Sequence, residues 1–234
     1  MSRIGRKKLI INDGFNPELA DGARFEGIFQ FPAIEPLREI AYPKYLVPFS
    51  ERNKITNPAE AFVVFYEHDD KFADIIRNPD AYIDDLARFA GVISPDNSLY
   101  RDIPLACQVA NIYRNRLIGS YLQRRGIMVI PNLRWGDERT YCKELFGEAI
   151  AFSSAPKYSV VAVGCYGCIR GEENKKYFID GFLAMLDDLK PKAVIIYGKL
   201  PDDIIELLCG KTKLIIYNDW TSARHGKDSI YGQW

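Results

Sequence analysis

The sequence predicts an α/β fold with mostly parallel strands, and three observations lead to that prediction. Six short apolar runs, rich in β-branched and aromatic residues, recur along the 234-residue chain. The runs are continuous rather than alternating, as expected of strands that are buried on both faces. Their first residues lie 31, 35, 33, 33 and 21 positions apart, and a strand–helix–strand unit needs about 30 residues. The six runs are Ala61–Tyr66, Val92–Ser94, Ile127–Ile130, Val160–Val163, Ala193–Tyr197 and Leu214–Tyr217.

Two further segments have strand-like composition. Tyr45–Phe49 and Arg24–Phe31 are both rich in aromatic and aliphatic residues. With them the predicted strands number eight, which fits a (β/α)8-like barrel that is imperfect in places. Polar residues follow almost every strand rather than a single switch point. This distribution favours the barrel over the alternative, an open doubly wound sheet.

Helical signals lie between the strands. Asn78 precedes Pro79, so a capping side chain comes before a proline that suits the first helical turn. Pro201 begins another helix, and Gly210 follows its end. Apolar residues at helical spacing predict the remaining helices. These residues are Ile83, Leu86 and Phe89, then Ala106, Ala110, Tyr113, Leu117 and Tyr121, and finally Phe178, Phe182, Met185 and Leu189.

The predicted domain organisation is simple. Residues 1–22 are predicted to form an N-terminal arm that carries Arg3, Arg6, Lys7 and Lys8. Residues 23–234 are predicted to form one barrel-like domain, because no linker-like composition interrupts them. A chain of this length can bury a sizeable core.

The composition excludes several classes of protein. Hydrophobic residues make up 47% of the chain, which excludes a disordered or low-complexity chain. Lys and Arg together number 31, as do Asp and Glu, so a global basic field for nucleic acid is absent. Neither a membrane span nor a secretory signal is recognisable. The five cysteines, an odd number, indicate reduced thiols and a cytoplasmic protein.

Two carboxylates are the predicted catalytic residues. Asp96 and Asp219 each lie one or two residues beyond an apolar strand, and ligands bind beyond the carboxyl ends of strands in both candidate architectures. A pair of carboxylates at one rim can divide the roles of base and nucleophile. The alternative for each is a helix cap, because aspartate often fills that position.

The rest of the rim is dense in amides, hydroxyls and aromatic rings. These side chains predict a substrate site for a nucleotide-like ligand. The predicted substrate-binding residues are Ser94, Ser98, Tyr100, Asn132, Arg134, Trp135, Tyr197 and Asn218. The alternative is that loops are polar in any protein.

Cofactor and metal signals are weak, and no cofactor is predicted. Glu67, His68 and Asp69 are the candidate ligands if a metal binds, and the alternative is a solvated acidic helix start. Cys165 and Cys168 have C-x-x-C spacing. A zinc site, a redox pair and packed thiols are the three interpretations of that pair. Walker, G-x-G-x-x-G, G-x-S-x-G and H-E-x-x-H motifs are absent.

One predicted helix is strongly basic. Residues 101–125 hold five basic residues against one acidic residue, with aromatic residues between them. Basic charge with interleaved aromatic rings suits a nucleic acid, and the predicted nucleic-acid-binding residues are Arg114, Arg116, Arg124 and Arg125. The alternative is that this helix pairs with the acidic segment 60–90, which holds eight acidic residues against three basic ones.

An ordered series of motifs resembles one known family. It comprises Asp69-Asp70-x-Phe72, Asn78-Pro79, Ser94-Pro95-Asp96-x-Ser98-x-Tyr100, Asp102-x-Pro104, Asn111-x-Tyr113-Arg114-Asn115-Arg116, Gly126-Ile127-x-Val129-Ile130-Pro131 and Trp135-x-Asp137-Glu138. The family is an uncharacterised domain found in bacterial, archaeal and phage genomes, often near mobile elements. The resemblance implies that setting but no activity. The chain departs from the family at Tyr66-Glu67-His68-Asp69-Asp70, which is one residue longer than the usual Phe-Ile-Asp-Asp.

A fainter resemblance is to barrels that exchange guanine for a 7-deazaguanine. It rests on Ser94-Pro95-Asp96, on Val129-Ile130-Pro131 with Trp135, on Gly164-x-x-x-Cys168-x-Arg170 and on Asp219-Trp220-x-x-Ala223-Arg224. The resemblance implies that Asp219 attacks the anomeric carbon and that Asp96 moves a proton. The zinc-ligand pattern of those enzymes is not reproduced here.

Two classes of function follow. The first is an enzyme of a phage or mobile element that acts on a glycosidic bond or exchanges a nucleobase through Asp96 and Asp219. The alternative is a non-catalytic protein that binds nucleic acid or a nucleotide-like ligand.

Overall fold

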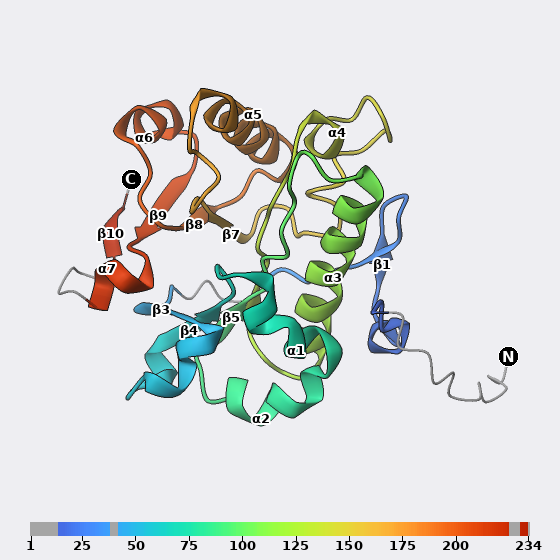
Figure 1. The fold of residues 1–234 in the computed structure, drawn as a ribbon, viewed down its shortest axis with the longest axis vertical. Coiled ribbons are helices and arrows are strands. Elements are labelled where there is room, and N and C mark those ends of the chain that lie inside the picture. The colour runs from blue at the N-terminus through green and yellow to red at the C-terminus, as the bar shows by residue number, and fades with distance from the viewer. Residues whose placement is uncertain (1–13, 38–41, 225–229, 234) are drawn as a thin grey trace, which may run out of the picture.

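The computed structural model describes residues 14–37, 42–224 and 230–233, and it has two four-stranded sheets (Figure 1). The first sheet contains β3 (Tyr45–Pro48), β4 (Ala61–Val64), β5 (Gly91–Ile93) and β6 (Val129–Ile130). The second contains β7 (Val160–Gly164), β8 (Ala193–Tyr197), β9 (Lys213–Tyr217) and β10 (Ile230–Gln233). A short hairpin of β1 (Phe25–Glu26) and β2 (Phe31–Pro32) lies apart from both sheets.

Neighbouring strands follow the order of the chain, and all pairs from β3 to β9 within the two sheets are parallel. Only β10 pairs antiparallel, with β9. A single parallel bridge between Asn132 and Ala162 joins the two sheets. The carboxyl ends of seven parallel strands therefore gather at one edge of the molecule.

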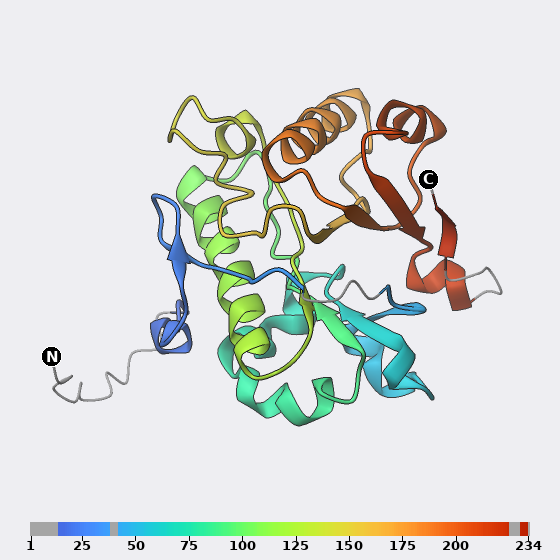
Figure 2. The same cartoon turned by 180° about the vertical axis from the view of Figure 1, so that it is seen from behind.

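Helices cover the outer faces of the sheets, as Figure 2 shows from behind. The α-helices are α1 (Ala73–Arg77), α2 (Ile83–Leu86), α3 (Leu105–Arg124), α4 (Glu138–Tyr141), α5 (Glu172–Leu189), α6 (Asp202–Leu208) and α7 (Trp220–Arg224). Short 3-10 helices precede or connect them at η1 (Pro17–Ala20), η2 (Phe49–Lys54), η3 (Pro58–Glu60), η4 (Asp69–Phe72) and η5 (Pro79–Tyr82). No described helix is long and apolar enough to cross a lipid bilayer.

The core is divided by the alternation of side chains along each strand. Val161 and Val194 face outward and pack with Phe182 of α5. On the first sheet, Val63 and Val92 likewise face outward, toward the helices α1 to α3. The opposite faces of both sheets meet in one cluster, formed by Leu46, Phe62, Val64, Ile93, Ile130, Val160, Ala162, Ala193, Ile195, Tyr197, Ile215 and Tyr217. The inner faces thus pack on each other while the helices lie outside.

The α/β class and the mostly parallel strands are confirmed, whereas a closed eight-stranded barrel is not found in the described residues. The segment predicted as one strand, Arg24–Phe31, folds back as the β1–β2 hairpin because the chain turns at Gly27, whose φ is +72°. Beyond the Asn132–Ala162 bridge, no ladder joins the two sheets within the described part of the chain.

The predicted arm is described only from residue 14 onward, so Arg3, Arg6, Lys7 and Lys8 lie outside the described residues. Within residues 14–22, η1 lies against α3. The buried Asn16 side chain donates a hydrogen bond to the Ile76 carbonyl at 2.5 Å. These contacts join the described end of the arm to the helices that cover the first sheet.

Candidate functional site

A cavity of about 670 Å³ lies at the carboxyl ends of the parallel strands. Its lining comes from residues that follow six different strands. They are Ser50 after β3, Tyr66 and Glu67 after β4, Asp96 and Ser98 after β5, Arg134 and Trp135 after β6, Tyr166 and Cys168 after β7, and Asp219 and Trp220 after β9. Tyr197, the last residue of β8, completes the wall. Small-molecule sites typically have volumes of about 300–1,000 Å³, so this cavity is of the size that a small ligand needs.

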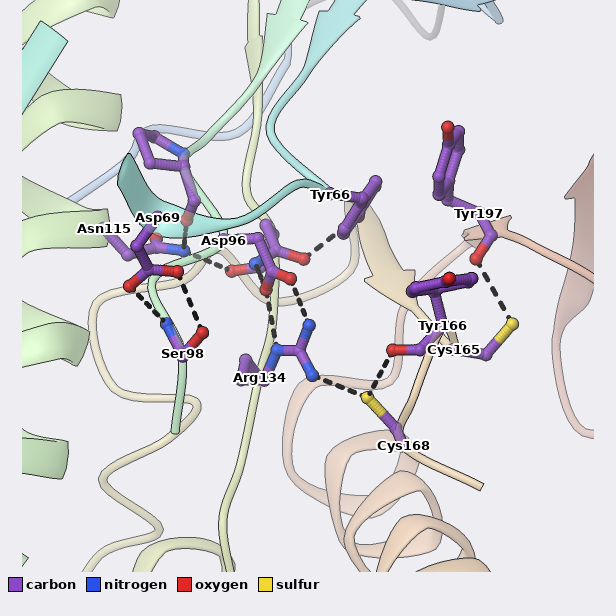
Figure 3. Close-up of polar contacts among 12 residues, drawn as sticks. Tyr66, Asp69, Asp96, Ser98, Asn115, Arg134, Cys165, Tyr166, Cys168 and Tyr197 are labelled. Atoms are coloured by element: carbon purple, nitrogen blue, oxygen red, sulfur yellow. Dashed lines mark hydrogen bonds and ion pairs between the residues drawn. The ribbon is translucent and has the colours of Figure 1, made fainter. Parts of the chain in front are cut away.

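Asp96 is buried on the cavity wall and forms a two-point ion pair with Arg134 (Figure 3). Arg134 Nε donates to Asp96 Oδ1 at 2.8 Å, and Arg134 Nη2 donates to Asp96 Oδ2. Asn132 Nδ2 also donates to Asp96 Oδ1, at 2.7 Å. Burial by itself lowers the pKa of Arg134, but the charge of Asp96 outweighs it, so that pKa lies well above its ordinary value. The Arg134 guanidinium is therefore charged at neutral pH.

The Arg134 guanidinium keeps donors that no described contact uses. Its Nη1 donates to Cys168 Sγ, so three of its nitrogens each make one contact to Asp96 or Cys168. Because a guanidinium carries five N–H groups, two N–H groups of Arg134 lie outside these three contacts. The side chain is 21% exposed, and it lines the cavity.

Two tyrosine rings stack beside this ion pair. The Tyr66 and Tyr197 ring centroids lie 4.8 Å apart, and the planes differ by 18°. Tyr66 Oη donates to Asn132 Oδ1 at 3.0 Å, which connects the stack to Asp96 through one amide. Burial, followed by the charge of Asp96, raises the pKa of Tyr66 well above its ordinary value. The ring lies against the backbone of Gly164, where a Cβ would come within 2.4 Å of Tyr66 Cδ1.

Asp219 lines the same cavity but caps the helix α7. Ser222 N donates to Asp219 Oδ1 at 3.0 Å, and Ser222 Oγ donates to Oδ2 at 2.7 Å. Burial by itself raises the pKa of Asp219, but the hydrogen bonds from Ser222 outweigh it and hold the pKa below its ordinary value. The structure therefore brings Asp96, Trp135 and Asp219 to one cavity, as the parallel strands predicted, while each carboxylate already accepts hydrogen bonds from the protein.

Two of the three candidate metal ligands, Glu67 and Asp69, accept hydrogen bonds from other loops of the chain. Glu67 Oε1 accepts a hydrogen bond from Ser50 N at 3.0 Å. Asp69 instead accepts from Ser98 N at 3.2 Å and Ser98 Oγ at 2.8 Å. Among the residues that the structure describes, no three His, Cys, Asp or Glu side chains converge on a metal position. Glu67 and Asp69 hold the loops after β3 and β5 in place.

Several predicted substrate-binding residues are structural. Ser94 is fully buried, and its Oγ donates to Asn115 Oδ1 and accepts from Asn132 N at 2.8 Å. Asn132 is also fully buried and positions Asp96. These contacts correct the prediction for Ser94 and Asn132, because neither residue belongs to the cavity lining. Asn218 is partly buried and is not part of the cavity lining.

Five of the predicted substrate-binding residues do line the cavity: Ser98, Tyr100, Arg134, Trp135 and Tyr197. Tyr100 is 60% exposed. Trp135 is 8% exposed, donates Nε1 to the Tyr177 carbonyl at 3.0 Å and packs on Phe178 and Phe182. Trp135 thus supports the wall from the core side.

The four predicted nucleic-acid-binding arginines of the basic helix α3 and its C-terminal end make contacts within the chain, but only Arg125 contacts the acidic segment 60–90. Arg116 is buried, and it donates to the carbonyls of Asn132, Ala151 and Ser153. Its burial lowers its pKa to about 10. A phosphate cannot reach this side chain, so the prediction that Arg116 binds nucleic acid is wrong.

The three other arginines of this set have partners on the surface. Arg114 donates to Asn111 Oδ1 at 2.8 Å, and Arg124 donates to the Asp21 carbonyl at 2.6 Å. Arg125 Nη2 forms an ion pair with Asp80 at 2.6 Å. Asp80 belongs to the acidic segment 60–90, so the two oppositely charged segments are in contact.

Tyr66, Tyr166 and Cys168 line the cavity but were not among the predicted substrate-binding residues. Tyr66 was included in a predicted strand, but β4 ends at Val64, so Tyr66 lies beyond the strand end. Tyr166 and Cys168 follow β7, and the position of their turn relative to Arg134 depends on how the two sheets meet. The spacing of residues after strand ends was the available signal, and it applies to all three.

Comparisons with known proteins give a family and two phage relatives. A family model described as "Domain of unknown function (DUF4417)" matches residues 23–218. The "Gene 1 protein" of Mycobacterium phage D29 is 29% identical over 136 residues, which is 58% of this chain and 48% of the phage protein. The "Gene 1 protein" of Mycobacterium phage L5 is 29% identical over 136 residues, 58% of this chain and 56% of the phage protein.

The chain thus spans about half the length of the curated relatives it matches. No solved structure matches it. The fainter resemblance to guanine-exchanging barrels receives no support from these matches.

Proposed function

Because the chain belongs to the family whose description is a domain of unknown function, we propose its function from the site alone: the cavity binds a small molecule with a planar heteroaromatic ring, such as a nucleobase or a nucleotide. The observation that carries the proposal is the joint lining of one cavity of about 670 Å³ by aromatic rings and by the Asp96–Arg134 ion pair. Pockets that combine apolar rings with a few fixed polar groups are typical of small-molecule sites.

The aromatic residues supply flat surfaces for a ring. Tyr66, Tyr166, Tyr197 and Trp220 all line the cavity. Tyr66 and Tyr197 are held by their own stack and by hydrogen bonds to Asn132 and from Trp220 N. Tyr166 is 77% exposed, so its ring is accessible to a ligand. Stacking of a base on an aromatic side chain contributes about 1–3 kcal/mol.

The ion pair supplies directed hydrogen bonding. Asp96 fixes the guanidinium of Arg134 at two points, so little side-chain freedom remains to be lost when a ligand binds. The two N–H groups of Arg134 outside these contacts match the carbonyl and ring-nitrogen acceptors of a nucleobase, or the oxygens of a phosphate. The fixed Arg134 donor beside the aromatic rings distinguishes this cavity from one lined by apolar side chains alone.

The experiment is a thermal-shift screen of the full chain against nucleobases, nucleosides and nucleoside monophosphates, followed by isothermal titration of each ligand that raises the melting temperature. We expect Tyr166→Ala to weaken binding at least about tenfold, the equivalent of about 1.4 kcal/mol, without changing the stability of the free protein. Tyr158→Ala is the matched control, because Tyr158 is 60% exposed and is not part of the cavity lining. If no compound of these classes shifts the melting temperature, the proposal fails.

A second candidate function is hydrolysis or exchange at a glycosidic bond, and the observation in its favour is that Asp96 and Asp219 line the same cavity. In that reaction Asp219 would attack the anomeric carbon as the bond to the base breaks, and Asp96 would transfer the proton that the departing base needs. Water or an incoming base would then displace the sugar from Asp219 and restore the carboxylate. The separating variant is Asp219→Asn, because asparagine caps a helix as well as aspartate does. Release of free base from a bound nucleoside that stops in this variant supports catalysis. If the unaltered protein binds the nucleoside but releases no free base, the glycosidic reaction is excluded and ligand binding remains the proposed function.

A further inference from the structure

A four-residue turn after β7 brings two thiols to the cavity wall. Cys168 N donates to the Cys165 carbonyl at 3.1 Å, which closes the turn, and Gly167 provides its positive φ of +76°. The ends of a β-turn lie within about 7 Å, and the Cα atoms of a disulfide usually lie about 4.4–6.8 Å apart. The Cα spacing of a β-turn is therefore compatible with a disulfide, provided that the two side chains, which contact Tyr197 and Arg134, rotate toward each other.

The two thiols are held differently (Figure 3). Cys165 is 2% exposed, and its Sγ lies 3.2 Å from the Tyr197 carbonyl oxygen. Gly198 leaves the room for it, because a Cβ there would come within 2.9 Å of this sulfur. Cys168 lines the cavity and accepts a hydrogen bond from Arg134 Nη1. A small reagent in the cavity can thus reach Cys168 but not Cys165.

From this arrangement we infer that Cys165 and Cys168 form a thiol–disulfide redox site that reacts with low-molecular-weight disulfides. The Cys168 thiolate attacks one sulfur of the reagent, forms a mixed disulfide and releases the first thiolate. The Cys165 thiolate then attacks the Cys168 sulfur and releases the second. Two protein thiols are oxidised to one disulfide, the reagent is reduced to two thiols, and the two cysteine protons go to the leaving groups.

The guanidinium of Arg134 supports the first step because its positive charge lies against Cys168 Sγ, where the thiolate forms. Burial is the larger influence and raises the pKa of Cys168, and it raises the pKa of Cys165 to about 12. The thiolate fraction is therefore small at neutral pH, and the oxidation rate rises with pH. Closing the disulfide turns Cys168 Sγ toward Cys165, so Arg134 loses its sulfur contact on the cavity wall. This inference does not depend on the ligand proposed above.

The test uses the full chain with Cys107→Ser and Cys209→Ser, which remove the two exposed cysteines. The protein is incubated with oxidised glutathione, unreacted thiols are alkylated, and the products are mapped by mass spectrometry. We expect a Cys165–Cys168 disulfide that dithiothreitol reverses. In Cys165→Ser we expect a stable glutathione adduct on Cys168, and in Cys168→Ser we expect Cys165 to stay free.

The outcomes separate cleanly. A glutathione adduct that persists on Cys168 while Cys165 is present, or two thiols that both stay alkylatable, overturns the inference. A second readout is the Arg134 Nε–H resonance, which we expect to shift on oxidation of the chain with both cysteines and to stay in place in Cys168→Ser on the same treatment. Neither readout uses a nucleobase, so failure here is distinct from failure of the proposed function.

Discussion

At the scale of single residues, the ion pair of Asp96 and Arg134 dominates the site. Asp96 is 4% exposed and Arg134 is 21% exposed, so both charges have lost much of their hydration. Such a pair is costly to form, and removal of one partner leaves a charge without compensation. Under the proposed function, Asp96 fixes Arg134 as a hydrogen-bond donor on the cavity wall.

Asp96→Asn keeps the side-chain shape but removes the negative charge beside Arg134. We expect a loss of about 3 kcal/mol in the free energy of unfolding, measured by urea denaturation. Glu173→Gln is the control, because it also removes the acidic partner of an arginine, Arg101, but on the surface. We expect that control to unfold like the unaltered chain. If Asp96→Asn were as stable as the unaltered chain, the buried charge of Arg134 would not depend on the charge of Asp96 for its compensation.

Asp219 provides a pH-dependent prediction. Its pKa is lowered in the folded protein, so its ionised form stabilises the folded state above the ordinary pKa of an aspartate, and this contribution is lost as the pH falls through the folded pKa. Asp219→Ala should lose about 1 kcal/mol at pH 7, and Asp219→Asn should lose less, because asparagine still caps α7. The difference between the unaltered chain and Asp219→Asn should disappear on acidification. A difference that grows toward low pH would contradict this assignment.

At the scale of elements, the packing of α3 explains why Arg116 is buried although its sequence context predicts a nucleic-acid-binding residue. The helix packs against the hairpin strand β2 and against η1 as well as against the sheet strand β6, so polar residues that look surface-exposed by composition are enclosed. Gln108, Asn115, Arg116 and Ser120 of this helix are all buried. Net charge over a segment cannot reveal which of its arginines turns inward, because that depends on the loop 149–155 that covers it.

Arg116→Lys tests this structural role. Lysine keeps the charge but cannot reach the three carbonyls that the guanidinium contacts. We expect a loss of about 2–4 kcal/mol in the free energy of unfolding, since several buried carbonyls lose their donors. Arg114→Lys on the same helix is the control. If Arg116→Lys retained full stability, the internal role would be wrong.

The end of β7 determines the position of Tyr66. Gly164→Ala would drive a methyl group into the Tyr66 ring, so we expect a loss of about 1–3 kcal/mol from overpacking. In a Tyr66→Ala background the same change should cost almost nothing, and chemical denaturation of the four proteins completes the cycle. Additive effects would mean that Gly164 acts on something other than Tyr66.

At the scale of the whole molecule, seven of the eight predicted strands and the order of the helices were predictable. Continuous apolar runs such as Ala193–Tyr197 match their strand residue for residue. The resemblance to an uncharacterised family with phage members is also confirmed. Whether the strands close into a barrel was not predictable from the sequence. It depends on how the strands β6 and β7 meet, and only the Asn132–Ala162 bridge forms between the two sheets there. The position of Asp96 and Asp219 in one cavity was predictable from the parallel strands. The hydrogen-bond partners of the two carboxylates were not predictable.

The most direct test of the central claim is photolabelling with an azido-purine nucleoside, followed by peptide mapping. We predict that the label attaches to peptides that contain Tyr66, Tyr166, Tyr197 or Trp220, the aromatic residues of the cavity. An excess of the unmodified nucleoside should abolish it, and Tyr166→Ala should reduce it while Tyr158→Ala does not. Label that is scattered over the surface, or that resists competition, would contradict ligand binding in this cavity.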